Sequence, residues 1–191
     1  SEKIENPSKA LSLGLAMIYQ ELNPVKDMSV AENIFLGREP MKKGNLFVDF
    51  NKMYDDAKVL LDDFGMNINP KKKMRELSTA HKQMIEIIKA VSLNAKIIVM
   101  DEPTSSLTDE EVTILFKTIE RLKKQNVAII YISHRLEEVF LIADRATVLR
   151  DGQYIGTDSI KNLNKDKLIS MMVGRELKDI YPKGKSHIGE T

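Results

Sequence analysis

Polar side chains of types found in catalytic sites follow three short apolar segments of the chain. Each segment has the composition of a buried β-strand, and in an open parallel sheet the carboxyl ends of the strands meet at one edge, where ligands bind. The polar residues at these ends are Gln20, Asp101, Glu102 and His134. Each of them alone has an ordinary structural explanation, but together they predict one site at one edge of a sheet.

The residue types at this edge suit phosphoryl transfer. Asp101 ends an apolar strand, where an aspartate can hold Mg²⁺, often through water. The neighbouring carboxylate of Glu102 can orient and deprotonate an attacking water. His134 or Gln20 can contact a terminal phosphate or the water shell of the metal. Ser78 is expected to begin a helix, where free N–H groups and the helix dipole both favour a phosphate.

The order of the elements predicts an α/β fold on a parallel sheet, because apolar strands alternate with amphipathic helices. Strands are expected at 15–19, 97–100, 127–132 and 146–149. The last of these turns at Asp151-Gly152, which is a good signal for a two-residue hairpin. Helix N-caps are expected at Asn6, Ser29, Asn51, Ser78 and Thr108.

The segment 22–76 carries helical patterns and no buried strand, so we expect an inserted helical subdomain there. The sheet domain then comprises residues 1–21 and 77–180. The polar stretch 181–191 is expected to be a tail or linker.

Composition argues against several functions. Lys plus Arg is 29 and Asp plus Glu is 28, so the net charge of +1 gives no basic footprint for nucleic acid. The chain has no cysteine, which excludes disulfides and thiolate metal sites and fits a cytoplasmic location. No apolar run reaches the ~18 residues of a membrane span, and no signal peptide is recognisable. The first residue is Ser1 rather than Met, so we expect a chain cut from something longer.

Five stretches, in this order, resemble the motifs of the ATP-binding cassettes of ABC transporters. They are Ile18-Tyr19-Gln20-Glu21 for the Q-loop, Leu77 to Gln83 for the signature, Ile97 to Thr104 for the Walker B strand and catalytic glutamate, Ser105 to Thr108 for the D-loop, and Tyr131 to His134 for the switch histidine. Any one motif is weak, but their order and spacing match over nearly the whole chain. The resemblance implies a P-loop NTPase (RecA-like) fold.

Two departures from the family pattern carry information. The signature usually reads Leu-Ser-Gly-Gly-Gln, whereas Thr79, Ala80 and His81 stand here, and Ala80 is bulkier than the glycine that permits close phosphate approach. Such loosened signatures are seen in the fused, two-cassette ATPases of monosaccharide importers. The first cassette of galactose and methyl-galactoside importers is also similar to 33–40, 47–49 and 171–177.

The second departure is that no G-x-x-x-x-G-K-[ST] sequence, the Walker A phosphate loop, occurs in the chain. The resemblance implies that this loop lies upstream of the Q-loop, so we expect the chain to begin after it, with the early strands also missing. We therefore expect the chain alone to bind ATP weakly and not to hydrolyse it.

The resemblance implies an ATP- and Mg²⁺-dependent ATPase that powers sugar import from the cytoplasmic face of the membrane. It assigns catalysis to Glu102 and His134, nucleotide binding to Gln20, Ser78 and Asp101, and the metal to Asp101 and Gln20. The implied partners are a second cassette fused in the parent protein, whose site Ser78 would complete, the transmembrane permease subunits, and indirectly an external sugar-binding protein.

Two other function classes stay open. The first is a soluble ABC-type ATPase that acts on DNA or ribosomes, although the coiled-coil insertions or basic arms usual in that class are absent from the sequence. The second is a non-catalytic scaffold, against which Glu102 and His134 argue for the parent protein but not for this chain alone. The sequence does not identify the sugar.

Overall fold

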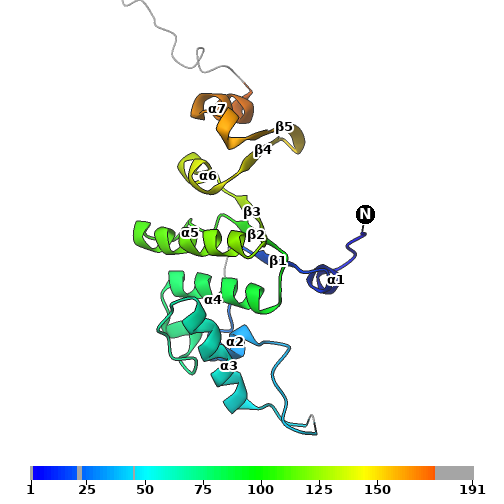
Figure 1. The fold of residues 1–191 in the computed structure, drawn as a ribbon, viewed down its shortest axis with the longest axis vertical. Helices are drawn as coiled ribbons and strands as arrows, with labels where there is room; N and C mark the ends of the chain where they lie inside the picture. Colours follow the sequence, from blue (N-terminus) through cyan, green and yellow to red (C-terminus); the bar gives the residue numbers. More distant parts are fainter. Residues whose placement is uncertain (1, 21–22, 45, 175–191) are drawn as a thin grey trace, which may run out of the picture. The chain divides into compact units, whose positions relative to one another are not determined.

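The computed structural model describes residues 2–20, 23–44 and 46–174, and the chain divides into two compact units, Ser1–His134 and Arg135–Thr191. The first unit contains α1 (Pro7–Ser12), β1 (Leu15–Ile18), α2 (Val30–Ile34), α3 (Phe50–Asp63), the 3₁₀ turn η1 (Met74–Glu76), α4 (Thr79–Ser92), β2 (Ile97–Asp101), α5 (Asp109–Lys124) and β3 (Ala128–Ile132) (Figure 1). The second contains α6 (Leu136–Ile142), β4 (Arg145–Arg150), β5 (Gln153–Ser159), η2 (Ile160–Asn162) and α7 (Lys165–Val173). The expected tail at 181–191 lies outside the described residues.

Side-chain caps fix where most helices begin. Ser29 and Thr108 both form complete capping boxes, and Asn6 and Ser78 each accept a backbone N–H of the first turn, as expected. The predicted cap at Asn51 is wrong. Asp49 accepts the N–H of Lys52 at 3.1 Å instead and α3 begins at Phe50, so Asn51 already lies inside the first helical turn.

The first unit is built on a parallel sheet in the order β1-β2-β3. Ile18 of β1 lies beside Met100 of β2, and Met100 lies beside Tyr131 of β3. The side chains of this face are packed on helices: α4 contacts β1, α5 contacts β3, and the ring of Phe116 meets that of Tyr131 edge-on at 6.3 Å. The parallel α/β prediction is confirmed.

The opposite face of the same sheet is only partly covered. Met17, Val99 and Ile130 are neighbours on it, and the side chains of Met17 and Ile130 are 42% and 51% exposed. Parallel sheets are ordinarily covered on both faces. Within the described residues, helices therefore cover one face of this sheet, and the other face is partly exposed.

The segment between β1 and α4 is helical, as expected. It holds α2, α3 and η1, and its described residues form only isolated β-bridges, Ser29 with Lys73 and Met41 with Val48. α2 packs against both α3 and α4, and its buried side chains join the core of the first unit. The division of this unit into an ATPase core and a separate helical subdomain stays a prediction.

The second unit is a small layer of helices on an antiparallel hairpin. β4 and β5 pair from Arg145 with Ser159 to Arg150 with Gln153. The turn is Asp151-Gly152, with φ values of 52° and 75°, as the sequence predicts. Ala146, Val148, Leu163 and Leu168 form its buried core. α7 ends at Gly174 in the left-handed conformation.

Candidate functional site

The carboxyl edge of the parallel sheet gathers the predicted chemistry. Gln20 lies two residues beyond β1, Asp101 is the last residue of β2, and His134 lies two residues beyond β3. Because the strands are parallel and in register, all three ends lie at the same edge. The topology therefore supports the prediction of one site.

The backbone turns sharply at Glu102, immediately after β2. Its φ of 44° lies in the left-handed region, which a residue with a Cβ occupies only at a cost. Two hydrogen bonds hold the turn, because the Glu102 N–H donates to the carbonyl of Ile132 at 2.9 Å and the Glu102 carbonyl accepts the N–H of Ser105 at 3.2 Å. The first of these bonds extends the ladder between β2 and β3 by one residue and brings Glu102 to the end of β3.

The carboxylate of Glu102 is held by both of its oxygens. Gln20 donates from Nε2 to Oε2 at 3.1 Å, and His134 Nδ1 lies 2.9 Å from Oε1. Residues from three strand ends, distant in sequence, are thus joined through one carboxylate. The Glu102 side chain is 28% exposed, which leaves the carboxylate open to solvent. The side chain of His134 is 68% exposed, so it is more accessible to solvent than that of Glu102.

The contact between Gln20 and Glu102 was not anticipated. The sequence placed both residues at the same edge, but the expected partners of Gln20 and His134 were a phosphate or the water shell of a metal. In the structure both contact the carboxylate directly. No sequence signal could have shown this, because it depends on the left-handed turn at Glu102.

Asp101 lies beside this group, half-buried, opposite Ile132 of β3. No group of three or more His, Cys, Asp or Glu side chains capable of holding a metal occurs among the described residues. Mg²⁺ usually binds through one or two carboxylates, with phosphate oxygens and water completing the shell. The donors available here are the carboxylate of Asp101 and the amide oxygen of Gln20, both of the hard oxygen type that Mg²⁺ prefers.

Ser78 has different hydrogen-bond partners from the other predicted site residues. It caps α4, where its Oγ accepts the N–H of His81 at 3.3 Å and lies 3.1 Å from His81 Nδ1. Among the described residues no hydrogen bond joins Ser78 to Gln20, Asp101, Glu102 or His134. The anion-binding helix start that the sequence predicts is therefore present, but it is not part of the carboxylate group.

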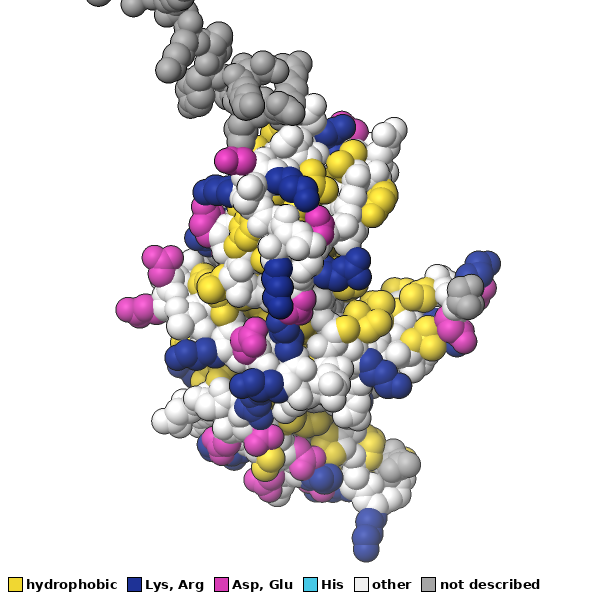
Figure 2. Space-filling view, turned by 45° about the horizontal axis from the view of Figure 1, so that its top comes forward, with side chains coloured by type: hydrophobic (Ala, Val, Ile, Leu, Met, Phe, Trp, Pro, Cys, Tyr) yellow, Lys and Arg dark blue, Asp and Glu magenta, His cyan; other side chains and the backbone are white. Residues whose placement is uncertain are grey.

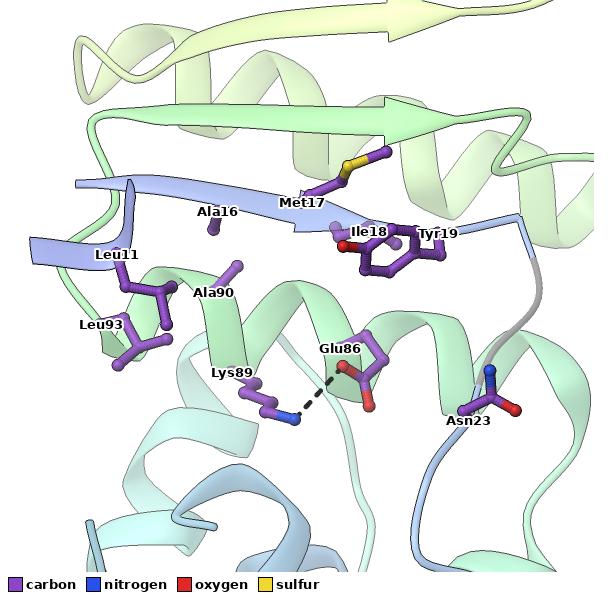
Figure 3. A pocket seen from close by; sticks show the side chains of 10 residues that line it. All are labelled: Leu11, Ala16, Met17, Ile18, Tyr19, Asn23, Glu86, Lys89, Ala90 and Leu93. Atoms are coloured by element: carbon purple, nitrogen blue, oxygen red, sulfur yellow. Dashed lines mark ion pairs between the residues drawn. The ribbon is translucent and has the colours of Figure 1, made fainter. Parts of the chain in front are cut away.

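A groove of about 290 Å³ runs between the outer edge of β1 and α4 (Figure 3). Its wall on the β1 side includes Ala16, Ile18 and Tyr19, and its α4 side includes Ala90 and Leu93. Figure 3 shows Ala16 pointing toward α4 and Met17 pointing away from it.

The polar side chains of the groove come from α4 and from the chain before α2. Glu86 and Lys89 form an ion pair at 3.6 Å on α4, and Asn23 lies on the other side of Glu86 from Lys89 (Figure 3). Tyr19, which lines the groove, directly precedes Gln20. One peptide bond therefore connects Tyr19, which lines the groove, to Gln20, which contacts the Glu102 carboxylate.

Asn33 is a buried polar residue that the sequence did not single out. It is 2% exposed, and its amide bonds both the N–H and the carbonyl of Val25, at 2.8 and 3.1 Å, and the carbonyl of Ser29 at 2.9 Å. These bonds fix the chain that follows the Q-loop residue Gln20. Its sequence offers no distinguishing signal, because Glu32 beside it in α2 is also polar.

Charged side chains of both signs share the face of the molecule drawn in Figure 2. On the face drawn in Figure 2, Lys and Arg side chains are interspersed with Asp and Glu, with hydrophobic side chains between them. No helix among the described residues is both long enough and apolar enough to cross a membrane.

Comparison with curated proteins gives consistent relatives. The chain is 54% identical, over 95% of its length, to a protein of Halalkalibacterium halodurans named putative ribose/galactose/methyl galactoside import ATP-binding protein, and covers 35% of that protein. It is 51% identical, over 97% of its length, to the galactose/methyl galactoside import ATP-binding protein MglA of Clostridium perfringens, and covers 36% of it. The chain thus spans about a third of the length of these curated relatives.

Solved structures show the same fold. An ATP-binding cassette of an ABC transporter is 26% identical, with a TM-score of 0.72 over 87% of this chain and 71% of that one. A nucleotide-free cassette of an ABC transporter, 22% identical, has a TM-score of 0.69 over 94% of this chain and 73% of that one. The P-loop NTPase fold predicted from the sequence is confirmed. The sequence model of the ABC transporter family matches residues 2–105, more than half of the chain, and the protein belongs to that family.

Proposed function

We propose that this chain is part of the ATP-hydrolysing subunit of an importer for galactose, methyl galactoside or a related monosaccharide. The observation that carries the proposal is the carboxylate of Glu102, held between Gln20 and His134 at the carboxyl edge of a parallel sheet. The names of the relatives support the import function and the class of sugar.

Glu102 is the proposed general base. Its carboxylate takes the proton of the attacking water as the water oxygen bonds to the terminal phosphorus of ATP, and ADP leaves. Each carboxylate oxygen can accept a second hydrogen bond, so the attacking water can bind to Glu102 while Gln20 and His134 keep their bonds to it.

Gln20 and His134 are the proposed positioning groups. Each approaches a different oxygen of the carboxylate, and two such bonds fix both the plane and the direction of the carboxylate. A base fixed in this way loses little freedom when the water binds, which is how orientation lowers a barrier. When ATP is bound, the imidazole of His134 and the amide of Gln20 are the groups free to turn to the terminal phosphate.

Asp101 and Gln20 are the proposed Mg²⁺ ligands. The metal would supply positive charge to the phosphate oxygens and so stabilise the charge that develops as the bond to the leaving ADP breaks. The backbone amides and lysine of a phosphate loop are not among the 191 residues of this sequence. The chain by itself is therefore expected to bind ATP weakly and not to turn it over.

The groove between β1 and α4 is the proposed docking surface for a transmembrane permease subunit. It joins exposed apolar side chains, Leu11 and Tyr19 at 46% and 61% exposure, to the ion pair of Glu86 and Lys89, a mixture typical of specific protein contacts. Its position next to Gln20 would let a movement of the permease reach the partner of the base. The protein would then work at the cytoplasmic face of the membrane, and an external sugar-binding protein would take part only indirectly.

A second cassette is the other proposed partner. Ser78 has no bond to the carboxylate group of its own chain, and in this family the signature closes across the dimer. Ser78 is therefore assigned to the nucleotide site of the opposite cassette.

The test uses the full-length protein that contains this chain, with the second cassette inactivated. Glu102→Gln keeps the shape of the side chain and removes the base, so hydrolysis should fall by ~10²–10⁴-fold while ATP still binds. Glu110→Gln, an exposed acid in the first turn of α5, is the matched control and should leave the rate unchanged. Equal rates for Glu102→Gln and the unmodified protein would falsify the assignment.

A further inference from the structure

The loop between α2 and α3 closes into a short hairpin. Met41 and Val48 form an antiparallel bridge, and the N–H of Lys42 donates to the carbonyl of Phe47 at 2.9 Å. Figure 1 shows this loop reaching away from the helices on either side of it. These contacts join Met41 and Lys42 to Phe47 and Val48 across the hairpin.

The far end of this hairpin exposes large apolar side chains. Leu46 is 81% exposed and Phe47 is 72% exposed, while Met41 at the bridge is 43% exposed. Leu46 is the most exposed of the large hydrophobic side chains in the described part of the chain. Adjacent apolar side chains of this size, held out together on a projecting hairpin, commonly mark a contact with a partner or a membrane.

The same end carries only positive charge among its described residues. Lys42 and Lys43 are both exposed. Two acids lie at the base of the hairpin, where Glu39 accepts the N–H of Gly37 at 3.0 Å and Asp49 accepts the N–H of Lys52 at 3.1 Å. The end of the hairpin therefore carries two exposed apolar side chains, Leu46 and Phe47, close in sequence to two exposed lysines, Lys42 and Lys43.

We propose that this apolar-basic tip, formed by Met41, Lys42, Lys43, Leu46 and Phe47, inserts into the headgroup region of an anionic lipid bilayer. Leu46 and Phe47 enter the boundary of the acyl chains, and the two lysines remain at the level of the anionic headgroups. This contact requires neither nucleotide nor permease and so goes beyond the proposed function.

The absence of tryptophan from the sequence allows a direct test. Phe47→Trp places one fluorophore at the tip. With the purified chain and protein-free vesicles of equimolar phosphatidylcholine and phosphatidylglycerol, its emission should shift to the blue and be quenched by brominated acyl chains. Vesicles of phosphatidylcholine alone should give a much smaller change.

Co-sedimentation with the same vesicles separates the two contributions. Leu46→Ser with Phe47→Ser should weaken binding by about tenfold or more, and Lys42→Gln with Lys43→Gln by about fivefold per lysine. Leu141→Ser, which removes an apolar side chain that is 71% exposed on α6, and Lys117→Gln with Lys124→Gln on α5 are the matched controls and should bind normally.

Two outcomes overturn the proposal: an unshifted Trp emission on anionic vesicles, or a shift that appears only when permease is present in the membrane. The second outcome assigns the tip to a protein partner. Because neither measurement contains ATP or follows its hydrolysis, neither outcome bears on the ATPase assignment.

Discussion

Single residues at the carboxyl edge act as a group rather than one by one. Glu102 connects Gln20 to His134, so a change in any of the three alters the surroundings of the other two. Residues that act as a unit show strongly non-additive losses when they are replaced together.

We therefore predict that His134→Ala lowers the hydrolysis rate of the full-length protein nearly as much as Glu102→Gln does. The double variant should be little worse than either single variant, because the second change removes a group that has already lost its partner. The measurement is steady-state ATPase activity with the partner cassette inactivated. Two independent losses that multiply in the double variant would show that His134 acts apart from Glu102.

The sequence predicts which residues form this site better than it predicts how they meet. Strand ends in a parallel sheet fix the common edge, so Gln20, Asp101, Glu102 and His134 could be placed there from apolar runs alone. The bonds between them depend on the positive φ of Glu102, and a non-glycine residue carries no reliable sign of that conformation. The place of Ser78 relative to the group depends on tertiary packing.

At the scale of elements, buried polar side chains determine how the loops are held. Asn33 bonds three backbone groups around the turn before α2, whereas the ion pair of Arg75 with Asp27 in the same region lies on the surface. The first is shielded from water and the second is screened by it.

We predict that Asn33→Ala destabilises the first unit by roughly 1–3 kcal/mol, because the N–H of Val25 loses its partner. The carbonyls of Val25 and Ser29 keep the N–H groups of Met28 and Asn33. Asp27→Ala, which removes an exposed ion pair, should cost less than about 1 kcal/mol. Urea unfolding of both variants, followed by circular dichroism, provides the comparison. Equal midpoints for the two variants would contradict this account.

A second element-scale prediction concerns the end of β5. Lys167 lies 2.9 Å from Asp158, and this bond, with those from Asn162 and the N–H of Ser159, holds the pKa of Asp158 below its usual 3.8. A lowered folded-state pKa means that the stabilisation is present above pH 3.8 and is lost as the pH falls through the folded-state value. Asp158→Asn should therefore lower the melting temperature slightly at neutral pH and flatten its decline in acid. If the melting temperatures of the two proteins fell by equal amounts from neutral to acid pH, this prediction would be wrong.

At the scale of the molecule, β3 is an edge strand within the described residues. Its pairing is with β2, while β4 pairs with β5 in a separate sheet.

We predict that the isolated chain self-associates through β3. An edge strand offers unpaired backbone groups, and Ile130 and Ile132 on it are 51% and 44% exposed. Sedimentation velocity at increasing concentration should show a rising mean mass, and Ile130→Lys should suppress it. A monomer at every concentration would rule this out, as would an unchanged mass in the variant.

The general architecture was within reach of the sequence because its signals are local. Capping boxes, apolar runs and the Asp151-Gly152 turn fix the beginning and end of most elements. The cap at Asn51 was misplaced because Asp49, two residues earlier, has an equally suitable side chain and only the hydrogen bond decides between them. The uncovered face of the sheet was not predicted, because coverage is a property of the whole unit.

At the left-handed turn of Glu102, a substitution that stabilises the fold would also remove the proposed base. A glycine adopts a φ of 44° without the conflict that a Cβ brings, so Glu102→Gly would relieve strain of about 1 kcal/mol in the turn while removing the proposed base. Selection of this protein for heat resistance alone would then enrich inactive variants at this position. A screen intended to improve the protein must score turnover together with melting temperature.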